Sequence, residues 1–349
     1  EELKSLKTQR VSQEIAKRVK NRWDSIAKPL DSMGRFEDIF CKIGAIQGRE
    51  EIDISKKAVI VMCADNGIVR EGVSQSGQEV TRICAQNMAE GTTSVCRMAE
   101  PLGAKILPVD IGIAGEPLTG VRNMRVRPGT EDFLEKPAMT EEECLSAIEV
   151  GIGLVGELKD EGYNIVGTGE MGIGNTSTSS AMSAAILGLS AEEVTGRGAG
   201  LDDERLKKKK KVINDALEKY SFSSDTDAFE ILRTLGGLDI AGLCGVCIGG
   251  AKYHLPVVLD GLISGVAALT AQRILPGIGD FLIASHLSRE KAAIKIMEEL
   301  SLKPVIDADM ALGEGTGAVM MMALLDIAAR VYNSERHFSD INIEQYKRY

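Results

Sequence analysis

Five short apolar runs, each ending in polar or glycine-rich residues, constrain the fold of this 349-residue chain more than any other feature. They are rich in Val, Ile and Leu, and they lie at 58–65, 105–112, 163–169, 255–261 and 280–286. Longer stretches with helical spacing separate them, near 77–100, 140–161, 176–188, 203–219 and 262–274. Buried strands that alternate with helices predict an α/β protein with a doubly wound, mostly parallel sheet.

Both ends of the chain have a helical pattern instead. The spacing of apolar residues predicts an amphipathic helix over 2–20 and a second helix that begins near Phe36. Two further helices are expected over 288–301 and 315–333, followed by a polar tail.

Composition narrows the class of protein. The formal net charge of −10 disfavours a nucleic-acid partner, which needs a basic surface. No stretch reaches the roughly 18 apolar residues of a membrane span, and the charged N-terminal segment lacks the apolar core of a signal peptide. The seven cysteines are scattered, several of them in apolar runs, which predicts reduced thiols and a cytoplasmic location.

Polar segments follow the predicted strands: ADNG, GTGEMG, LDG and ASH. Ligands of parallel sheets bind outside the carboxyl ends of the strands, so a site is expected there. Asp260 in LDG is either a site residue or a strand-end acid that caps a helix. His286 in ASH is either an active-site base or a hydrogen-bonded loop residue.

Two glutamates from opposite halves of the chain are framed by glycines, Glu170 in GTGEMG and Glu314 in LGEGTGA. Glycine lets the backbone approach a ligand closely and adopt positive φ. Two such carboxylates indicate a site that is assembled when the chain folds.

The segment around Glu170 also contains G-x-G-x-x-G, at Gly167, Gly169 and Gly172, which invites a dinucleotide-binding interpretation. The hydroxyl-rich continuation GNTSTSS favours a single phosphate at a helix start, cradled by Gly174, Asn175, Thr176 and Ser177. The plainer alternative is a Ser/Thr cap on an ordinary helix.

Two other motifs have plain interpretations. CGVC (Cys244–Cys247) is a lone CxxC without the second pair or the histidines of a zinc site, so structural packing and no metal are expected. The run Lys207–Lys211 reads as a solvated helix face from which one lysine could reach a phosphate.

Taken in order, several segments resemble the nicotinate-nucleotide:dimethylbenzimidazole phosphoribosyltransferase family over roughly residues 25–333. The segments are KPLDSMGRFE, VMCADNGIVREGVSQSGQEVT, GTGEMGIGNTSTSSA, GRGAGLDDERL, GGLDIAGLCG, PVVLDGLISGVAAL, SHLSREKAA and MALGEGTGA. The resemblance implies a Rossmann-like catalytic domain, 46–287, and a small helical domain built from both termini, 1–45 with 288–349. It also implies a homodimer, or a heterodimer with a homologous subunit.

The resemblance further implies transfer of a 5-phosphoribosyl group from nicotinate mononucleotide to an aromatic base of cobamides, with no cofactor. Glu314 matches the general base and Glu170 the second acid of the pocket. Phosphate- or ribose-binding positions are matched by Gly172, Gly174, Asn175, Thr176 and Lys209, the lysine coming from a neighbouring subunit. Ser76 and Cys84 match positions that line the acceptor.

The chain departs from the family pattern at four positions, Asn66, Gly77, Cys84 and Ala311, where the family has His, Pro, Gln and Arg. These differences leave three alternatives open. The acceptor is a phenol or p-cresol and the chain is one subunit of a heterodimer; or the chain is a weakly active partner subunit; or, from the G-x-G-x-x-G motif alone, it is an NAD-dependent dehydrogenase.

Overall fold

The computed structural model describes residues 7–198, 200–334 and 336–348, and its centre is a six-stranded parallel sheet. The strands are β1 (Lys57–Ala64), β2 (Lys105–Gly112), β3 (Arg122–Asn123), β4 (Ile165–Met171), β5 (Val257–Leu259) and β6 (Leu282–Ala284). They lie in the order β3-β2-β1-β4-β5-β6, with every neighbouring pair parallel, as in doubly wound nucleotide-binding folds. The predicted α/β class is confirmed, and each of the five apolar runs overlaps a strand.

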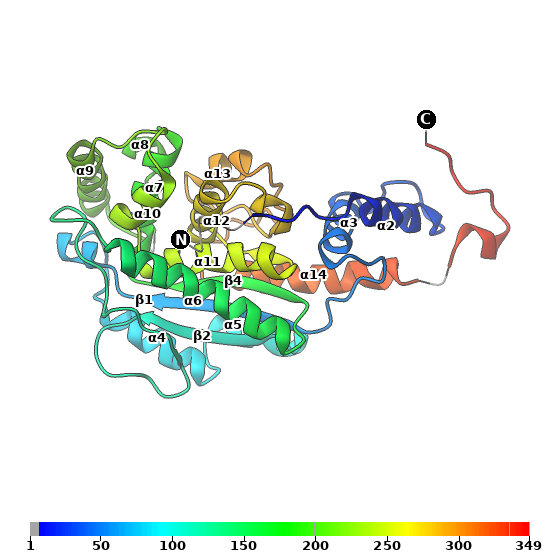
Figure 1. The fold of residues 1–349 in the computed structure, drawn as a ribbon, viewed down its shortest axis with the longest axis horizontal. Coiled ribbons are helices and arrows are strands. Elements are labelled where there is room, and N and C mark those ends of the chain that lie inside the picture. Colours follow the sequence, from blue (N-terminus) through cyan, green and yellow to red (C-terminus); the bar gives the residue numbers. More distant parts are fainter. Residues whose placement is uncertain (1–6, 199, 335, 349) are drawn as a thin grey trace.

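Helices cover both faces of this sheet (Figure 1). One face carries α6 (Glu141–Asp160), α7 (Asn175–Leu187), α10 (Ala228–Leu235), α11 (Leu238–Tyr253) and α12 (Leu262–Ile274). The other carries α4 (Glu79–Ala89), α5 (Ser94–Ala99) and α14 (Thr316–Tyr332), with α2 (Gln13–Ser25) and α3 (Arg35–Gln47) at its end. The remaining α-helices of the described chain are α8 (Ala191–Val194), α9 (Asp203–Tyr220) and α13 (Ala293–Glu299).

Strand β1 shows why its sequence is apolar throughout. All eight of its residues are buried, and successive side chains point to opposite faces of the sheet. Ile60 and Met62 belong to the hydrophobic cluster under α6 and α11, whereas Val59 and Val61 belong to the cluster under α4 and α14. A strand covered on both sides reads as a continuous apolar run, which is why the runs were the clearest signal.

The helix predictions hold in outline, and the differences from the structure are largest in two stretches, 2–20 and 77–100. The helix expected over 2–20 begins only at Gln13, because the Ser12 side chain caps it by accepting from the Ile15 N–H. Residues 7–12 are not helical, and the prediction over 2–6 lies outside the described residues. The stretch 77–100 is divided into α4 and α5 by a turn in which Gly91 has φ +73°.

One buried helix, α11, carries no clear pattern in the sequence. Nearly every residue of α11 is buried, so its sequence LDIAGLCGVCIGG has no polar face to mark a helical period. The short α10 precedes it directly. CGVC lies within α11 with both thiols buried and their pKa values raised by burial, so the expected packing role is confirmed.

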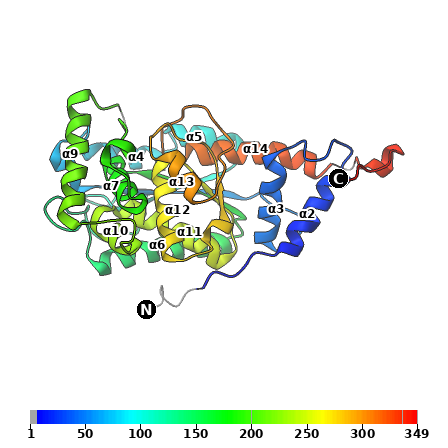
Figure 2. The same cartoon turned by 90° about the horizontal axis from the view of Figure 1, so that it is seen from above.

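The N-terminal helices pack against the end of α14 (Figure 2). Trp23 of α2, Phe40 of α3 and Tyr332 of α14 are fully buried, with ring centroids 5.0 to 5.4 Å apart. This aromatic cluster joins segments about 300 residues apart in sequence. The division into a catalytic domain and a helical domain of both termini stays a prediction.

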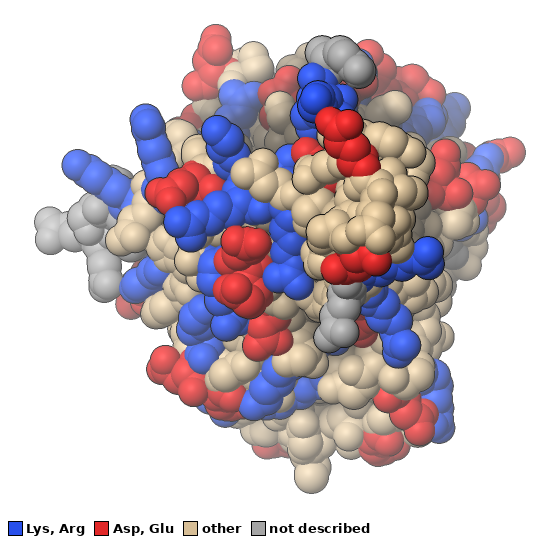
Figure 3. All heavy atoms as spheres, turned by 90° about the vertical axis from the view of Figure 1, so that its right-hand side faces the viewer, with Lys and Arg blue, Asp and Glu red and all other residues tan. Residues whose placement is uncertain are grey.

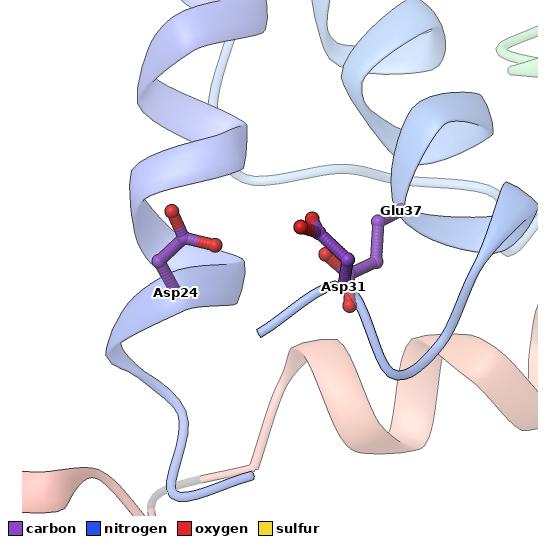
Figure 4. A group of neighbouring side chains, drawn as sticks. All are labelled: Asp24, Asp31 and Glu37. Atoms are coloured by element: carbon purple, nitrogen blue, oxygen red, sulfur yellow. The ribbon is translucent and has the colours of Figure 1, made fainter. Parts of the chain in front are cut away.

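Three carboxylates lie together at this end of the molecule: Asp24, Asp31 and Glu37 (Figure 4). Their spacing would suit a metal ion, but cations already pair with them. Lys20 and Lys28 each donate to Glu37 at 2.6 Å, and Arg348 donates to both aspartates. The cluster is therefore a charge-balanced link between the chain ends. Figure 3 shows acidic and basic side chains interspersed over this whole face.

Among the described residues, no helix is both long and apolar enough to cross a membrane.

Candidate active site

A cavity of about 270 Å³ opens at the carboxyl ends of β4, β5 and β6. Its walls come from the turn after β4, the start of α12, the segment after β6 and the loop before α14. The polar residues among those walls are Glu170, Asn175, Thr176, Asp260, Ser264, His286, Ser288, Glu290 and Glu314. The expectation that the polar segments after the strands would lie at a common edge is met for GTGEMG, LDG and ASH.

The two glycine-framed glutamates meet at this cavity. The backbone N–H of Glu314 donates to the backbone carbonyl of Glu170 at 3.3 Å, so the loop before α14 is bonded to the end of β4. Glu314 has φ +61°, a conformation that non-glycine residues rarely adopt. Such a conformation persists only where the surroundings hold it, and it is concentrated at functional sites.

Glycines let the two segments come this close. A Cβ on Gly169 of β4 would lie 2.7 Å from the carbonyl oxygen of Glu314, and one on Gly313 would lie 2.6 Å from the Glu170 carboxylate.

The surroundings of the three glycines of G-x-G-x-x-G argue against the dinucleotide interpretation. Gly167 makes room for Ala318 of α14, and Gly172 for Asp239, so the three glycines of G-x-G-x-x-G face protein atoms.

Burial controls the charge of both glutamates. It raises the pKa of Glu170, which is 8% exposed, to about 8; an Asn175 hydrogen bond opposes this, and the charges of Asp239, Asp260 and Glu314 add to it. Burial also raises the pKa of Glu314, against a hydrogen bond from the Val95 N–H. Near neutral pH, Glu170 is therefore largely protonated.

Behind Glu170 lies a buried acid that the sequence did not single out as a site residue. Asp239 is fully buried in the first turn of α11, and the Asn175 side-chain amide donates both to it, at 2.9 Å, and to Glu170. Burial raises the pKa of Asp239 to about 6. The signal available was the LD of GGLDIAG, but an acid inside an apolar segment also reads as a helix start.

Asp260 caps a helix, as one of its two interpretations predicted, although the helix is distant in sequence. Its carboxylate accepts from the N–H groups of Gly315, at 3.0 Å, and Gly317, at 2.7 Å, at the start of α14. Burial raises its pKa to about 6 against these bonds. Asp260 thus holds the loop that carries Glu314.

The start of α7 forms a second polar wall. Thr176 lines the cavity, and its hydroxyl accepts from Lys209 Nζ at 2.9 Å. Lys209 is fully buried, alone among the five lysines of its run, and burial lowers its pKa to about 8. Lys209 lies beside Thr176 of its own chain, and the expectation that this lysine enters from a neighbouring subunit stays a prediction.

The other predicted phosphate-binding residues divide into two groups. Gly172 and Asn175 line the cavity. Gly174 instead caps α7 with φ +95° and faces Val69, and Ser177 is buried within the helix; neither is among the residues that line the cavity.

The predicted acceptor residues lie outside the walls of this cavity. Cys84 is half-buried on α4, and after burial itself the charge of Glu314 raises the pKa of its thiol, which indicates proximity to that carboxylate. Ser76 is exposed in the loop before α4. The roles of both residues remain predictions, as do the catalytic and phosphate-binding roles above.

A cavity at the carboxyl edge of a doubly wound parallel sheet, with paired carboxyl groups inside, is the arrangement of an α/β enzyme. A family model described as Phosphoribosyltransferase matches residues 8–343. The chain is 43% identical over 330 residues to a nicotinate-nucleotide–dimethylbenzimidazole phosphoribosyltransferase of Acetivibrio thermocellus, covering 94% of each protein. It is 40% identical to one of Chloroflexus aggregans, covering 96% of this chain and 95% of that protein.

Solved structures agree with these sequence relatives. A crystal structure of CobT from Thermus thermophilus matches with a TM-score of 0.89 and 36% identity, covering 95% of this chain and all of that one. The chain therefore belongs to the nicotinate-nucleotide–dimethylbenzimidazole phosphoribosyltransferase family, and it is a phosphoribosyltransferase.

Proposed function

We propose that this enzyme transfers the 5-phosphoribosyl group of nicotinate mononucleotide to an aromatic base of the dimethylbenzimidazole type. The products would be nicotinate and an α-riboside 5′-phosphate for cobamide synthesis. The observation that carries the proposal is the meeting of Glu170 and Glu314 at one cavity, beside the Thr176–Lys209 pair. The names of the relatives support the same reaction.

The donor fits the distribution of charge. Its 5′-phosphate would bind the backbone N–H groups at the start of α7 and the ammonium group of Lys209. An anion there would favour the charged form of the lysine, whose pKa is lowered by burial. The cationic pyridinium ring and C1′ of the ribosyl group would then lie toward the carboxyl groups.

The reaction exchanges one C–N bond for another. The bond from C1′ to the pyridinium nitrogen breaks, its electron pair stays on nicotinate, and positive charge builds on the ribosyl ring. The charge of Glu314 favours that oxocarbenium-like state. The unprotonated ring nitrogen of the acceptor attacks C1′ from the opposite face, and the proton on its other ring nitrogen passes to Glu314. Glu170, largely protonated, would serve as a hydrogen-bond donor.

Cys84 supports a second candidate acceptor. A thiol is a weak hydrogen-bond donor and acceptor, so it cannot hold an azole as the glutamine of the family pattern would. A phenol acceptor, with a heterodimer partner, is the alternative that this difference favours. A substrate screen of benzimidazoles, purines and phenols, with mass-spectrometric detection of the nucleotide product, separates the candidates.

Replacement of the base tests the proposal. We expect Glu314→Gln to lower kcat at least about 100-fold with every acceptor, because proton transfer loses its base, while donor binding survives. Nicotinate release and calorimetric binding of nicotinate mononucleotide are the measurements, with Glu149→Gln on the exposed face of α6 as the control. Full activity of folded Glu314→Gln would refute the assignment. Activity of the wild type only after a second chain is added would favour the partner-subunit alternative.

A further inference from the structure

His286 and Glu290 line the cavity, and their buried polar atoms have no partner in the described chain. His286 is 5% exposed, and both ring nitrogens are without a hydrogen bond. One carboxylate oxygen of Glu290, Oε2, is likewise buried and unpaired. Leaving buried polar groups unpaired is costly, so atoms of this kind indicate where a polar ligand completes the site.

The imidazole is held in place by its surroundings. It lies between the segment after β5 and the start of α14, where a Cβ on Gly261 would come within 3.3 Å of the ring and a Cβ on Gly317 within 3.0 Å. The His286 backbone forms a bridge with Ile306. His286 is therefore not the hydrogen-bonded loop residue of one earlier interpretation, because its side chain has no partner in the described part of the protein.

Glu290 lies at the other end of this wall. Its carboxylate packs against Gly196, where any side chain would overlap it, and the Gly196 carbonyl accepts from Lys209 at 3.5 Å. The Glu290 charge also acts to raise the pKa of Lys209 against the effect of burial. Glu290 is thus next to the expected phosphate position.

The hydrogen-bonding capacity of the pair selects the ligand chemistry. Burial lowers the pKa of His286, so its ring is neutral and offers one N–H donor and one acceptor nitrogen. Glu290 adds an acceptor. A carboxylate or phosphate has no donor for these two acceptors. Of two neighbouring hydroxyl groups, one can pair with a ring nitrogen of His286 and the other can donate to Glu290.

We propose that His286 and Glu290 form a subsite for the vicinal hydroxyl groups of the ribosyl moiety, selecting ribose over deoxyribose. The inference rests on the proposed function, because it takes the ribosyl group to lie between the Thr176–Lys209 pair and the glutamates. Neither residue removes a proton from the acceptor. Their contribution is to bind and orient the sugar.

The test uses sugars that differ only in these hydroxyl groups. The wild type should bind ribose 5-phosphate about 10- to 100-fold more tightly than 2-deoxyribose 5-phosphate in calorimetry, because the deoxy sugar leaves buried groups unpaired. His286→Ala should lose most of that preference, and His286→Gln, which keeps a donor and an acceptor, should retain part of it. His254→Asn, outside the cavity walls, is the control.

Turnover provides the second measurement. With nicotinate mononucleotide, His286→Ala should lower kcat/KM about 10- to 100-fold, but with the 2′-deoxy donor by less than about threefold. Equal affinity of the wild type for the two sugar phosphates, or equal loss on both donors, would overturn the subsite. If the wild type releases no nicotinate while still preferring ribose 5-phosphate, the proposed function fails and the subsite stands. If His286→Ala does not fold, the wild-type sugar preference and His286→Gln decide.

Discussion

Glu170 shows how surroundings alone set the charge of a carboxyl group. It is buried, it shares the Asn175 amide with Asp239, and two more acids, Asp260 and Glu314, lie near enough to act on its pKa. Four carboxyl groups in so small a volume cannot all ionise, so the protein holds some of them neutral. The cationic pyridinium ring of the proposed donor would relieve this repulsion, which would couple donor binding to the proton content of the site.

This coupling predicts a dependence of stability on pH. The folded-state pKa of Glu170 is about 8 against an ordinary 4.5, so between these values the folded state binds the extra proton. The contribution of Glu170 to the free energy of unfolding is therefore fully present below about pH 4.5. It falls as pH rises toward 8, by up to about 1.4 kcal/mol per pH unit. Glu170→Gln should flatten the slope between pH 6.5 and 7.5 in urea unfolding, where Asp239 and Asp260, with pKa values of about 6, have largely ionised. A variant with the wild-type slope would contradict the pKa assignment.

At the scale of elements, α6 and α11 pack unusually closely because glycines line their contact. A Cβ on Gly151 of α6 would overlap the carbonyl oxygen of Gly242, and a Cβ on Gly245 of α11 would overlap that of Ile148. The same helix α6 also carries Gly153, which is exposed with nothing within 4 Å of a Cβ. Replacing each of these two glycines with alanine in turn therefore separates the effect of helix packing from that of helix propensity.

Gly151→Ala should lower the free energy of unfolding by about 1–3 kcal/mol, since the added methyl forces the helices apart. Gly153→Ala should raise it by about 0.5–1 kcal/mol, because alanine is the better helix former and nothing obstructs it. Urea unfolding of both variants measures the two values. Shifts of the same sign and size would show that the helix contact is not as close as described.

At the scale of the whole molecule, the chain closes on itself. The aromatic cluster of Trp23, Phe40 and Tyr332 fastens α2 and α3 to α14, whose other end carries the Glu314 loop. Lys42 of α3 adds a second link by donating to the carbonyls of Gly279, at 2.9 Å, and Leu282, at 2.7 Å, next to β6. The N-terminal helices are therefore linked to two segments that frame the site: to the Glu314 loop through α14, and to β6 through Lys42.

Trp23→Ala should cost about 3–5 kcal/mol of unfolding free energy, the range for removing a buried aromatic side chain. Limited proteolysis should then cut first in α2 and α3, because their main anchor to α14 is gone. Tyr346→Ala, which removes a 54% exposed aromatic ring near the C-terminus, is the control and should change stability little. Equal effects of the two substitutions would argue against the aromatic cluster as the fastening.

Local patterns were sufficient for the sheet and for the presence of a site. Strands buried on two faces leave continuous apolar runs, and strand ends leave polar segments, so both could be read without knowing the fold. The pairing of Glu170 with Glu314 could be suspected from glycine framing and assigned roles by family resemblance. Helix α11 could not be predicted from the sequence, because a helix that is buried nearly throughout has no polar face from which to recognise its period.

Local sequence patterns therefore determined the α/β order of elements and indicated the residue types suited to phosphate and carboxyl chemistry. Folding decided which of them meet: Asp239 behind Glu170, Asp260 under the Glu314 loop, and His286 left without a partner among the described residues. The physical reason is that pKa values and unpaired atoms depend on burial and on neighbours distant in sequence, which no short segment contains.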